Sequence, residues 1–347
     1  MLQKFAKSIT CALITLSAAT VCAQQYPSKA ITMIVPFSAG GPSDTIARIL
    51  AQAMSTTLKQ QIIITNVGGA GGTTGAARAA RSTPDGYTLL VHHIGHSTAP
   101  ALFENLAFDP IEDFEPIGII NDGASTFVTR KKLEFKDFKE FLEYVKTNKE
   151  KVNVANAGIG SASHLCDLLF QEAIGTGFTL IPYDGTGPAM RDMLVGGTID
   201  VMCDQSTNTT PHIQEGKLNV YAVTLPKRAA SMPNVPTADE AGLPGFNMSV
   251  WHALYAPKDT PKPIINYLAK SLQAALQDET LRRRYAELGA EAVPPEKATP
   301  EALAMHLKSE IDRWGAIIRR AGISDKCPDP TFSRARSFPW ANAGCKW

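Results

Sequence analysis

The sequence predicts an α/β protein built from two lobes, and three observations support this. Apolar runs of strand length alternate with segments of helical periodicity along most of the chain, which is typical of sheets covered by helices. The 347 residues are enough for two domains, and with 44% hydrophobic residues the chain can bury a sizeable core. One local design, in which a strand runs through a small-residue loop into a helix, occurs once in each half of the chain.

The periodicity places the individual elements in order. Strands are expected at residues 31–35, 61–65, 88–92, 117–120, 151–156, 179–182, 201–204 and 220–224. Helices are expected at residues 45–58, 138–147, 189–195, 263–276 and 300–321. Because the strands alternate with helices, we expect the sheets to be parallel.

The repeated design points to an anion. In the first half, the strand at 31–35 leads through PFSAGGPSD into a helix, and in the second half the strand ending at Asn156 leads through AGIGSASH into another. Glycines let the backbone approach a ligand, and the first amides of a helix have no partner within it. Such a helix end carries partial positive charge and suits an anion. One such loop in each half suggests two lobes that close on a single small acid.

Charge and the N-terminus narrow the class of protein. The net charge is +1, from 34 basic and 33 acidic residues, so there is no electrostatic case for a nucleic-acid partner or an anionic membrane surface. Lys4 and Lys7 precede an uncharged apolar stretch at 9–21, and Val21-Cys-Ala23 offers a cleavage site. We therefore expect residues 1–23 to be a signal peptide and the mature chain to start at Gln24.

Four cysteines would remain after cleavage, and their spacing matches no zinc site. Cys166 and Cys203 lie in apolar runs, so we expect buried free thiols, whereas Cys327 and Cys345 flank a polar tail and could pair with each other. The three histidines His92, His93 and His96 have no cysteine or carboxylate among them. We expect no metal ion and no cofactor, and strand alternation lets only one of His92 and His93 face a ligand.

The order of longer motifs resembles one family. VPFSAGGPSDTIAR, PDGYTLL, NAGIGSASHL, IPYDGTGPAMRDMLVGGTIDVMCD and PNVPTADEAGLPGF follow one another, and Trp314 lies in the last helix. This order is similar to that of the Bug family of periplasmic solute-binding receptors, which serve tripartite tricarboxylate transporters, and the likeness spans residues 26–323. It implies the periplasmic-binding-protein (Venus flytrap) fold, a small organic acid as ligand, and membrane permease subunits as partners.

The distribution of elements favours a discontinuous division of the chain, because the helices at 263–276 and 300–321 would make the second half heavy and the first light if they packed on the second half alone. Lobe 1 would comprise residues 24–123 plus 226–323, and lobe 2 residues 124–225. Two strand crossings near 117–127 and 220–225 would act as a hinge. Residues 324–347 lie outside the family pattern, and we expect them to form a poorly ordered tail on a monomeric protein.

The family pattern carries over onto a set of ligand-binding residues. The first loop supplies Phe37, Ser38, Ala39, Gly40 and Gly41. The facing loop supplies Asn156, Ala157, Gly158, Gly160, Ser161 and Ser163, and His93 and Asp204 border the same cleft. We expect a side chain at Gly40 to stand between the amides and the bound carboxylate.

Structural roles compete for several of these positions. Ser161 or Ser163 would also cap a helix, Asp44 would favour its helix through the dipole, and His164 would brace its loop. Asp204 would repel an anion unless it accepts a hydrogen bond from a ligand hydroxyl or ammonium group. It could equally be a strand-end residue that caps the next turn, and the sequence leaves the two alternatives open.

The predicted function is capture of a di- or tricarboxylate, with an aromatic acid such as terephthalate included, rather than catalysis. No Gly-x-Ser-x-Gly nucleophile elbow and no dinucleotide fingerprint are present. Two alternatives are a periplasmic hydrolase of an anionic ester and a subunit that presents its ligand to a membrane sensor.

Overall fold

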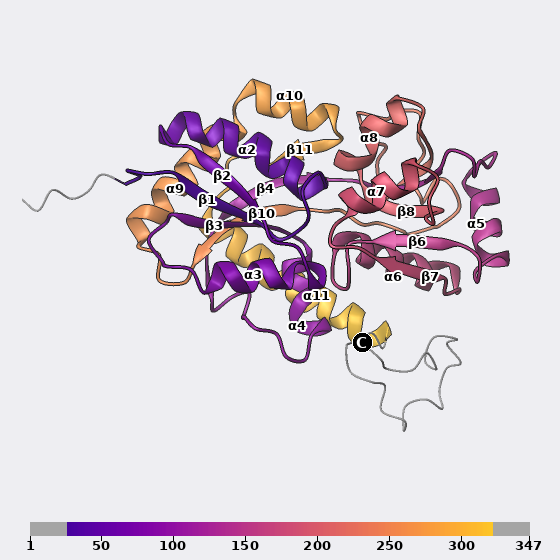
Figure 1. Ribbon diagram of the computed structural model, residues 1–347, viewed down its shortest axis with the longest axis horizontal. Coiled ribbons are helices and arrows are strands. Elements are labelled where there is room, and N and C mark those ends of the chain that lie inside the picture. Colours follow the sequence, from indigo (N-terminus) through magenta and orange to yellow (C-terminus); the bar gives the residue numbers. More distant parts are fainter. Residues whose placement is uncertain (1–25, 322–347) are drawn as a thin grey trace, which may run out of the picture.

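The computed structural model describes residues 26–321, which form two α/β lobes side by side, each built on its own sheet (Figure 1). The predicted signal peptide at 1–23, the tail at 324–347 and the pair Cys327 and Cys345 lie outside the described residues. No helix between residues 26 and 321 is both long and apolar enough to cross a membrane.

The first lobe has a six-stranded sheet with the order β11-β4-β10-β3-β1-β2. Its strands are β1 (Ile31–Val35), β2 (Ile62–Asn66), β3 (Thr88–His93), β4 (Phe114–Gly123), β10 (His252–Pro257) and β11 (Ala290–Ala292). Figure 1 shows helices on both faces of this sheet. One face carries α2 (Pro42–Leu58), α9 (Lys262–Leu276) and α10 (Glu279–Glu287), and the other carries η1 (Ala70–Gly72), α3 (Thr73–Ala80), α4 (Gly95–Leu102) and α11 (Pro300–Ala321).

The second lobe has a five-stranded sheet with the order β7-β6-β8-β5-β9. Its strands are β5 (Ser125–Arg130), β6 (Asn153–Asn156), β7 (Thr179–Pro182), β8 (Val201–Gln205) and β9 (Leu218–Val223), and its helices are α5 (Phe138–Thr147), α6 (Ala162–Ile174), α7 (Thr186–Leu194) and α8 (Ser206–Gln214). Successive side chains of β5 point to opposite faces of the sheet. Phe127 packs on Phe138 of α5 and Phe170 of α6, whereas Val128 belongs to the apolar cluster of Met190 on α7.

The expectation of purely parallel sheets is wrong. Strand β10 runs antiparallel to β3 and β4, and β5 runs antiparallel to β8 and β9. The reason lies in the connectivity between the lobes. The chain leaves the first sheet along β4 and passes almost directly into β5, so β10, which brings it back beside β4, must run in the opposite direction. The sequence analysis missed both β5 and β10.

Contacts between the segment at 246–250 and residues 123–127 indicate where the chain crosses back from lobe 2 to lobe 1. Ala124 forms a bridge with Ser249, and the Val250 N–H donates to the Gly123 carbonyl at 2.9 Å. Upstream of this point, the Phe246 ring lies 5.5 Å from that of Phe127 in the second sheet. We therefore propose that the return crossing lies at 249–251 rather than at 220–225, and that the segment 226–248 moves with lobe 2.

Cys166 of α6 and Cys203 of β8 form a disulfide, so the expectation of free thiols is wrong. Helix α6 packs directly on β8 and brings the two Cα atoms to 6.0 Å, within the normal range for a disulfide of about 4.4–6.8 Å. The two residues are 37 positions apart in the sequence, and no local pattern relates them. The bond ties the start of α6 to the end of β8.

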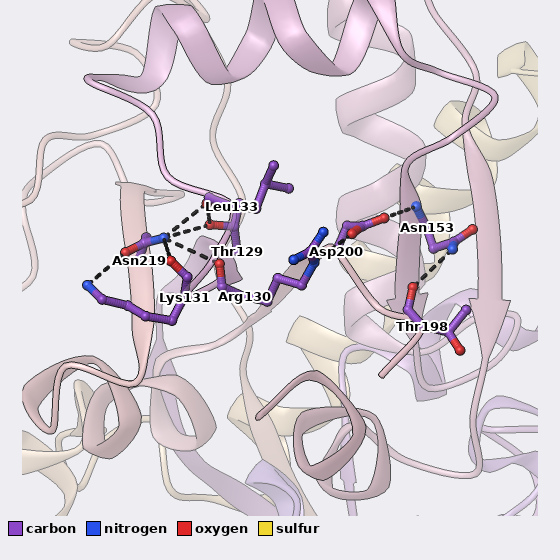
Figure 2. A network of polar contacts seen from close by, with 8 residues as sticks. All are labelled: Thr129, Arg130, Lys131, Leu133, Asn153, Thr198, Asp200 and Asn219. Atoms are coloured by element: carbon purple, nitrogen blue, oxygen red, sulfur yellow. Dashed lines mark hydrogen bonds and ion pairs between the residues drawn. The ribbon is translucent and has the colours of Figure 1, made fainter. Parts of the chain in front are cut away.

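A polar network holds together the end of the second sheet that is remote from the first lobe (Figure 2). The Arg130 guanidinium pairs with Asp200 at 2.8 Å, and Asp200 also accepts from the Asn153 N–H at 3.1 Å. The Asn219 amide donates to the Leu133 carbonyl at 3.0 Å in the loop after β5. This network fixes the amino ends of β6 and β8 relative to each other, and thereby sets the register of their carboxyl ends.

Candidate functional site

A cavity lies between the two lobes, at the carboxyl ends of β1, β3, β6 and β8. This edge is where ligands bind in open α/β sheets. In this conformation the cavity measures about 10 Å³, room for about one water molecule, so the lobes lie close together and a ligand requires them to separate. The cavity is lined by Phe37, Gly41, Pro42, Ser43, His93, Ala157, Ser161, Ala162, Ser163, Thr186, Asp204 and Gln205.

Four helices begin at this cavity. Pro42 and Ser43 open α2, Ala162 and Ser163 open α6, Thr186 opens α7, and Gln205 is the N-cap of α8. The first amides of each helix have no partner inside the helix, and their dipoles place partial positive charge at one point. Within the described residues no lysine or arginine lines the cavity. The arrangement therefore suits an anion that is held by neutral donors.

The first loop contributes less of its length than the sequence predicts. Phe37 and Gly41 line the cavity, whereas Ser38, Ala39 and Gly40 lie outside the lining. Two of the loop amides already have partners, since Ser38 donates to the Asp184 carbonyl at 3.0 Å and Gly40 donates to the Asp44 carboxylate at 2.9 Å.

Asp44 has a structural role, as the sequence suggests. Burial alone would raise the pKa of Asp44, but hydrogen bonds from Arg48, Gly40 and Asn66 hold that pKa below its usual value. The carboxylate thus stays charged and pins the loop to α2 and β2.

The second loop is braced by its own polar atoms. Asn156 accepts the Gly158 N–H at 3.0 Å, and His164 Nδ1 accepts the Gly160 N–H at 3.2 Å. His164 therefore braces the loop, as predicted. Neither Gly158 nor Gly160 lines the cavity, and Ala157, Ser161 and Ser163 do.

The two serines leave one hydroxyl proton for a ligand. Ser161 Oγ accepts the His164 N–H at 3.2 Å and so caps α6, while Ser163 Oγ accepts the Ala157 N–H at 2.9 Å. The two hydroxyls lie 3.2 Å apart, so one donates to the other. Each hydroxyl carries a single proton, and within the described residues no further acceptor contacts either one. The second proton is free to be donated into the cavity that both side chains line.

His93 and Phe37 form one wall of the cavity, and their rings stack on each other at 4.6 Å. His93 Nδ1 accepts the Gly95 N–H at 2.9 Å, which places the proton of the neutral ring on Nε2. Burial lowers the pKa of His93 to about 4, so the ring is neutral near pH 7. His92 is buried behind this wall and does not line the cavity, as strand alternation predicts.

The other two buried histidines of the first lobe have different surroundings. The His96 ring packs between Phe108 at 5.5 Å and Tyr255 at 4.7 Å. His252 Nε2 lies 3.0 Å from Ser43 Oγ at the cavity, but His252 Nδ1 has no partner among the described residues. A serine nucleophile needs a base that is itself oriented by a third group, and this pair lacks one. No group of three or more His, Cys, Asp or Glu in residues 26–321 is arranged to hold a metal ion.

Asp204 holds the turn after its strand and also lines the cavity. Its carboxylate accepts from the Gln205 N–H at 2.8 Å and from the Asn208 side-chain amide at 2.5 Å, so it braces the turn from β8 into α8. It also lines the cavity and is 1% exposed. Burial raises the pKa of Asp204 to about 6, against the opposing effect of these hydrogen bonds.

The sequence analysis missed α7 and α8 as parts of the site, and with them Thr186 and Gln205. For α7 a signal was available, because the strand β7 leads through YDG into Thr186-Gly-Pro188 and so repeats the strand, glycine and helix-start proline of the first loop. For α8 there was no such signal, since no glycine separates β8 from the helix.

Removing both hydroxyls tests the serine pair. We expect Ser161→Ala/Ser163→Ala to weaken dicarboxylate binding by roughly 10- to 150-fold, because a hydrogen bond to a charged partner contributes about 1.5–3 kcal/mol. The fold should lose only about 1 kcal/mol, the value of an N-cap. Calorimetric titration and thermal melting measure the two effects. Ser271→Ala, which removes another buried serine hydroxyl far from the cavity, is the control, and unchanged affinity in the double variant would remove these serines from the site.

Two α/β lobes with a cavity between them are typical of solute-binding proteins. A family model described as the tripartite tricarboxylate transporter family receptor matches residues 46–323, and this chain belongs to that family. The chain is 50% identical over 297 residues to the UPF0065 protein in the TAR-I ttuE-ttuC′ intergenic region of Agrobacterium vitis, covering 86% of each chain.

Two solved structures share the fold and much of the sequence. The periplasmic binding protein BugD superposes with a TM-score of 0.84 at 47% identity, over 86% of this chain and 99% of BugD. MatC from Rhodopseudomonas palustris with bound malate superposes with a TM-score of 0.81 at 41% identity, over 84% of this chain and all of that chain (100%). The predicted fold class and the resemblance to the Bug family are thus confirmed.

Proposed function

We propose that this protein is a periplasmic receptor that captures a small aliphatic dicarboxylate between its lobes and delivers it to the permease subunits of a tripartite tricarboxylate transporter. The observation that carries the proposal is the convergence of four helix N-termini on one cavity that no lysine or arginine of the described residues lines. Backbone amides and a serine hydroxyl hold a carboxylate without a countercharge.

The wall of the cavity favours an aliphatic over an aromatic ligand. Phe37 and His93 stack on each other, so no aromatic ring fits between them. MatC, at 41% identity, has malate bound, and malate is a four-carbon dicarboxylate.

The remaining parts of the proposal come from the sequence and the family. Export through the signal peptide at 1–23 would place a monomeric receptor in the periplasm, where BugD is described to reside. The family description favours transport over presentation to a sensor.

A ligand panel tests the function. Malate, succinate, citrate, terephthalate and acetate are each added to the purified protein, and melting and calorimetric titration are recorded. A ligand at 100 times its Kd stabilises the native state by about 2.7 kcal/mol, and we expect malate and succinate to give the largest rise in melting temperature. No shift with any of them contradicts a carboxylate receptor, and a larger shift with terephthalate contradicts the aliphatic class.

The same samples separate a receptor from a hydrolase. A receptor returns its ligand unchanged, so we expect chromatography after overnight incubation with a malate ester to recover only the ester. Release of the free acid, abolished by Ser43→Ala, would instead support catalysis by Ser43 and His252.

A further inference from the structure

Two buried carboxyl groups lie on the lobe 2 side of the cavity. Asp204 ends β8 and lines the cavity, and Asp167 lies on α6, where it is 0% exposed. The partners of both are neutral donors. Asp204 accepts from Gln205, Asn208 and the Thr186 hydroxyl, and Asp167 Oδ2 accepts from the Asn156 amide at 3.0 Å. Asp167 Oδ1 has no hydrogen-bond partner among residues 26–321. Neither carboxyl forms an ion pair with a described residue.

No cation among the described residues pairs with either of these two acids. Among the titratable groups around the cavity, His93 of β3, His164 of α6 and His252 of β10 are all neutral near pH 7, because burial lowers the pKa of each below its usual value. When two neighbouring carboxyl groups are buried without a cation, ionising both of them costs much more free energy than ionising one. Burial raises the pKa of Asp167 well above its usual value, and Asp204 adds to that effect. Asp167 is therefore the neutral member, and Asp204 is the group left to respond to a ligand.

An incoming dicarboxylate would place further negative charge beside Asp204, which favours the protonated form. The protonated carboxyl has an O–H to donate, and that O–H adds one donor to the helix amides and the serine hydroxyl. Protonation thus converts the one repulsive group in the lining into a hydrogen-bond donor.

We propose that Asp204 takes up a proton when a dicarboxylate binds and donates its O–H to a ligand carboxylate, so that the receptor captures the dianion together with one proton. This inference rests on the proposed function. One O–H bond forms on Asp204, and the proton comes from the buffer. The competing arrangement, in which an ionised Asp204 accepts a hydrogen bond from the hydroxyl of a 2-hydroxy acid, requires no proton and serves malate but not succinate.

The sign of the pH dependence follows from linkage. The free protein has Asp204 half protonated at about pH 6, and the bound protein remains protonated to a higher pH. Affinity should therefore rise as the pH falls from 8 towards 6, by up to tenfold per pH unit, and then level off. The neutral histidines do not titrate in this window.

Calorimetry in two buffers measures the proton directly. Succinate is titrated into wild-type protein at pH 7 in phosphate and in Tris, and the difference in apparent enthalpy gives the number of protons taken up. We expect nearly one proton for wild type. For Asp204→Asn, whose amide donates without ionising, we expect none, with a Kd that no longer varies between pH 6 and 8. Asp167→Asn is the matched control, and it should retain the proton uptake because Asp167 is already neutral.

The outcomes are distinct. If wild type binds succinate with no proton uptake, or if Asp204→Asn still takes up a proton, the inference is wrong and the receptor function stands. Tight binding of malate with no binding of succinate and no proton uptake would establish the competing arrangement. If none of the dicarboxylates binds to wild type, the proposed function itself fails.

Discussion

Gly187→Ala should weaken dicarboxylate binding by roughly 5- to 150-fold without destabilising the protein. Gly187 of α7 lies against the first loop of the other lobe, and a Cβ atom there would lie 2.8 Å from the Gly40 carbonyl carbon and 2.9 Å from the Gly41 nitrogen. Both neighbours are backbone atoms and cannot rotate away. One methyl group forced into a packed contact costs about 1–3 kcal/mol, which corresponds to the stated loss of affinity.

The melting temperature distinguishes a block to lobe closure from a folding defect. We expect the lobes of the free protein to separate enough to relieve this contact, and the new methyl group needs no left-handed backbone, since the φ angle of Gly187 is not positive. Alanine is a better helix former than glycine by about 1 kcal/mol, so the melting temperature without ligand should stay equal or rise. Gly315→Ala is the control, because its methyl group would meet only the mobile guanidinium of Arg319 at 3.0 Å. Normal affinity in Gly187→Ala would show that ligand binding does not bring the lobes to this contact.

Loss of the disulfide should have the largest effect on stability. The bond closes a loop between residues 37 apart, and the chain-entropy account assigns such a loop roughly 3–4 kcal/mol. Cys166→Ala/Cys203→Ala should therefore lower the melting temperature by roughly 5–15 °C. Affinity for dicarboxylates should fall as well, because Cys166 follows Ser163 by one helical turn and Cys203 precedes Asp204.

Reductant supplies the control for this variant. Wild type unfolded and refolded with reductant should melt like the double variant, whereas the double variant should not respond. Peptide mass mapping of protein isolated without reductant should find Cys166 and Cys203 in one linked species. Two free thiols at these positions would contradict the bond.

Local pattern determined much of the fold. The predicted helices at 138–147 and 300–321 coincide with α5 and α11, and the predicted strands at 31–35 and 179–182 coincide with β1 and β7. In each case the periodicity of apolar side chains lies within the segment itself. The sequence also placed a capping serine, Ser161 or Ser163, at the start of α6, and Ser161 is the cap. It expected the first helix from residue 45, whereas α2 already begins at Pro42.

Properties that depend on distant segments required the tertiary structure. Strand direction in the mixed sheets follows from the return path between the lobes, and the disulfide follows from the packing of α6 on β8. The reasoning about Gly40 shows the same limit. Its φ angle of +82° does favour glycine, but a Cβ there would face the Arg191 guanidinium at 3.6 Å rather than the cavity.

The sequence by itself thus determined the class of protein and the two loops that face each other, because the class and the loops both depend on short, local patterns of residue size and polarity. Only the tertiary structure decided which residues of those loops line the cavity, that α7 and α8 join them, and that Asp204 interacts with a second buried acid, Asp167. Contacts between lobes and the burial of a charge depend on how remote segments pack, and no window of sequence contains that information.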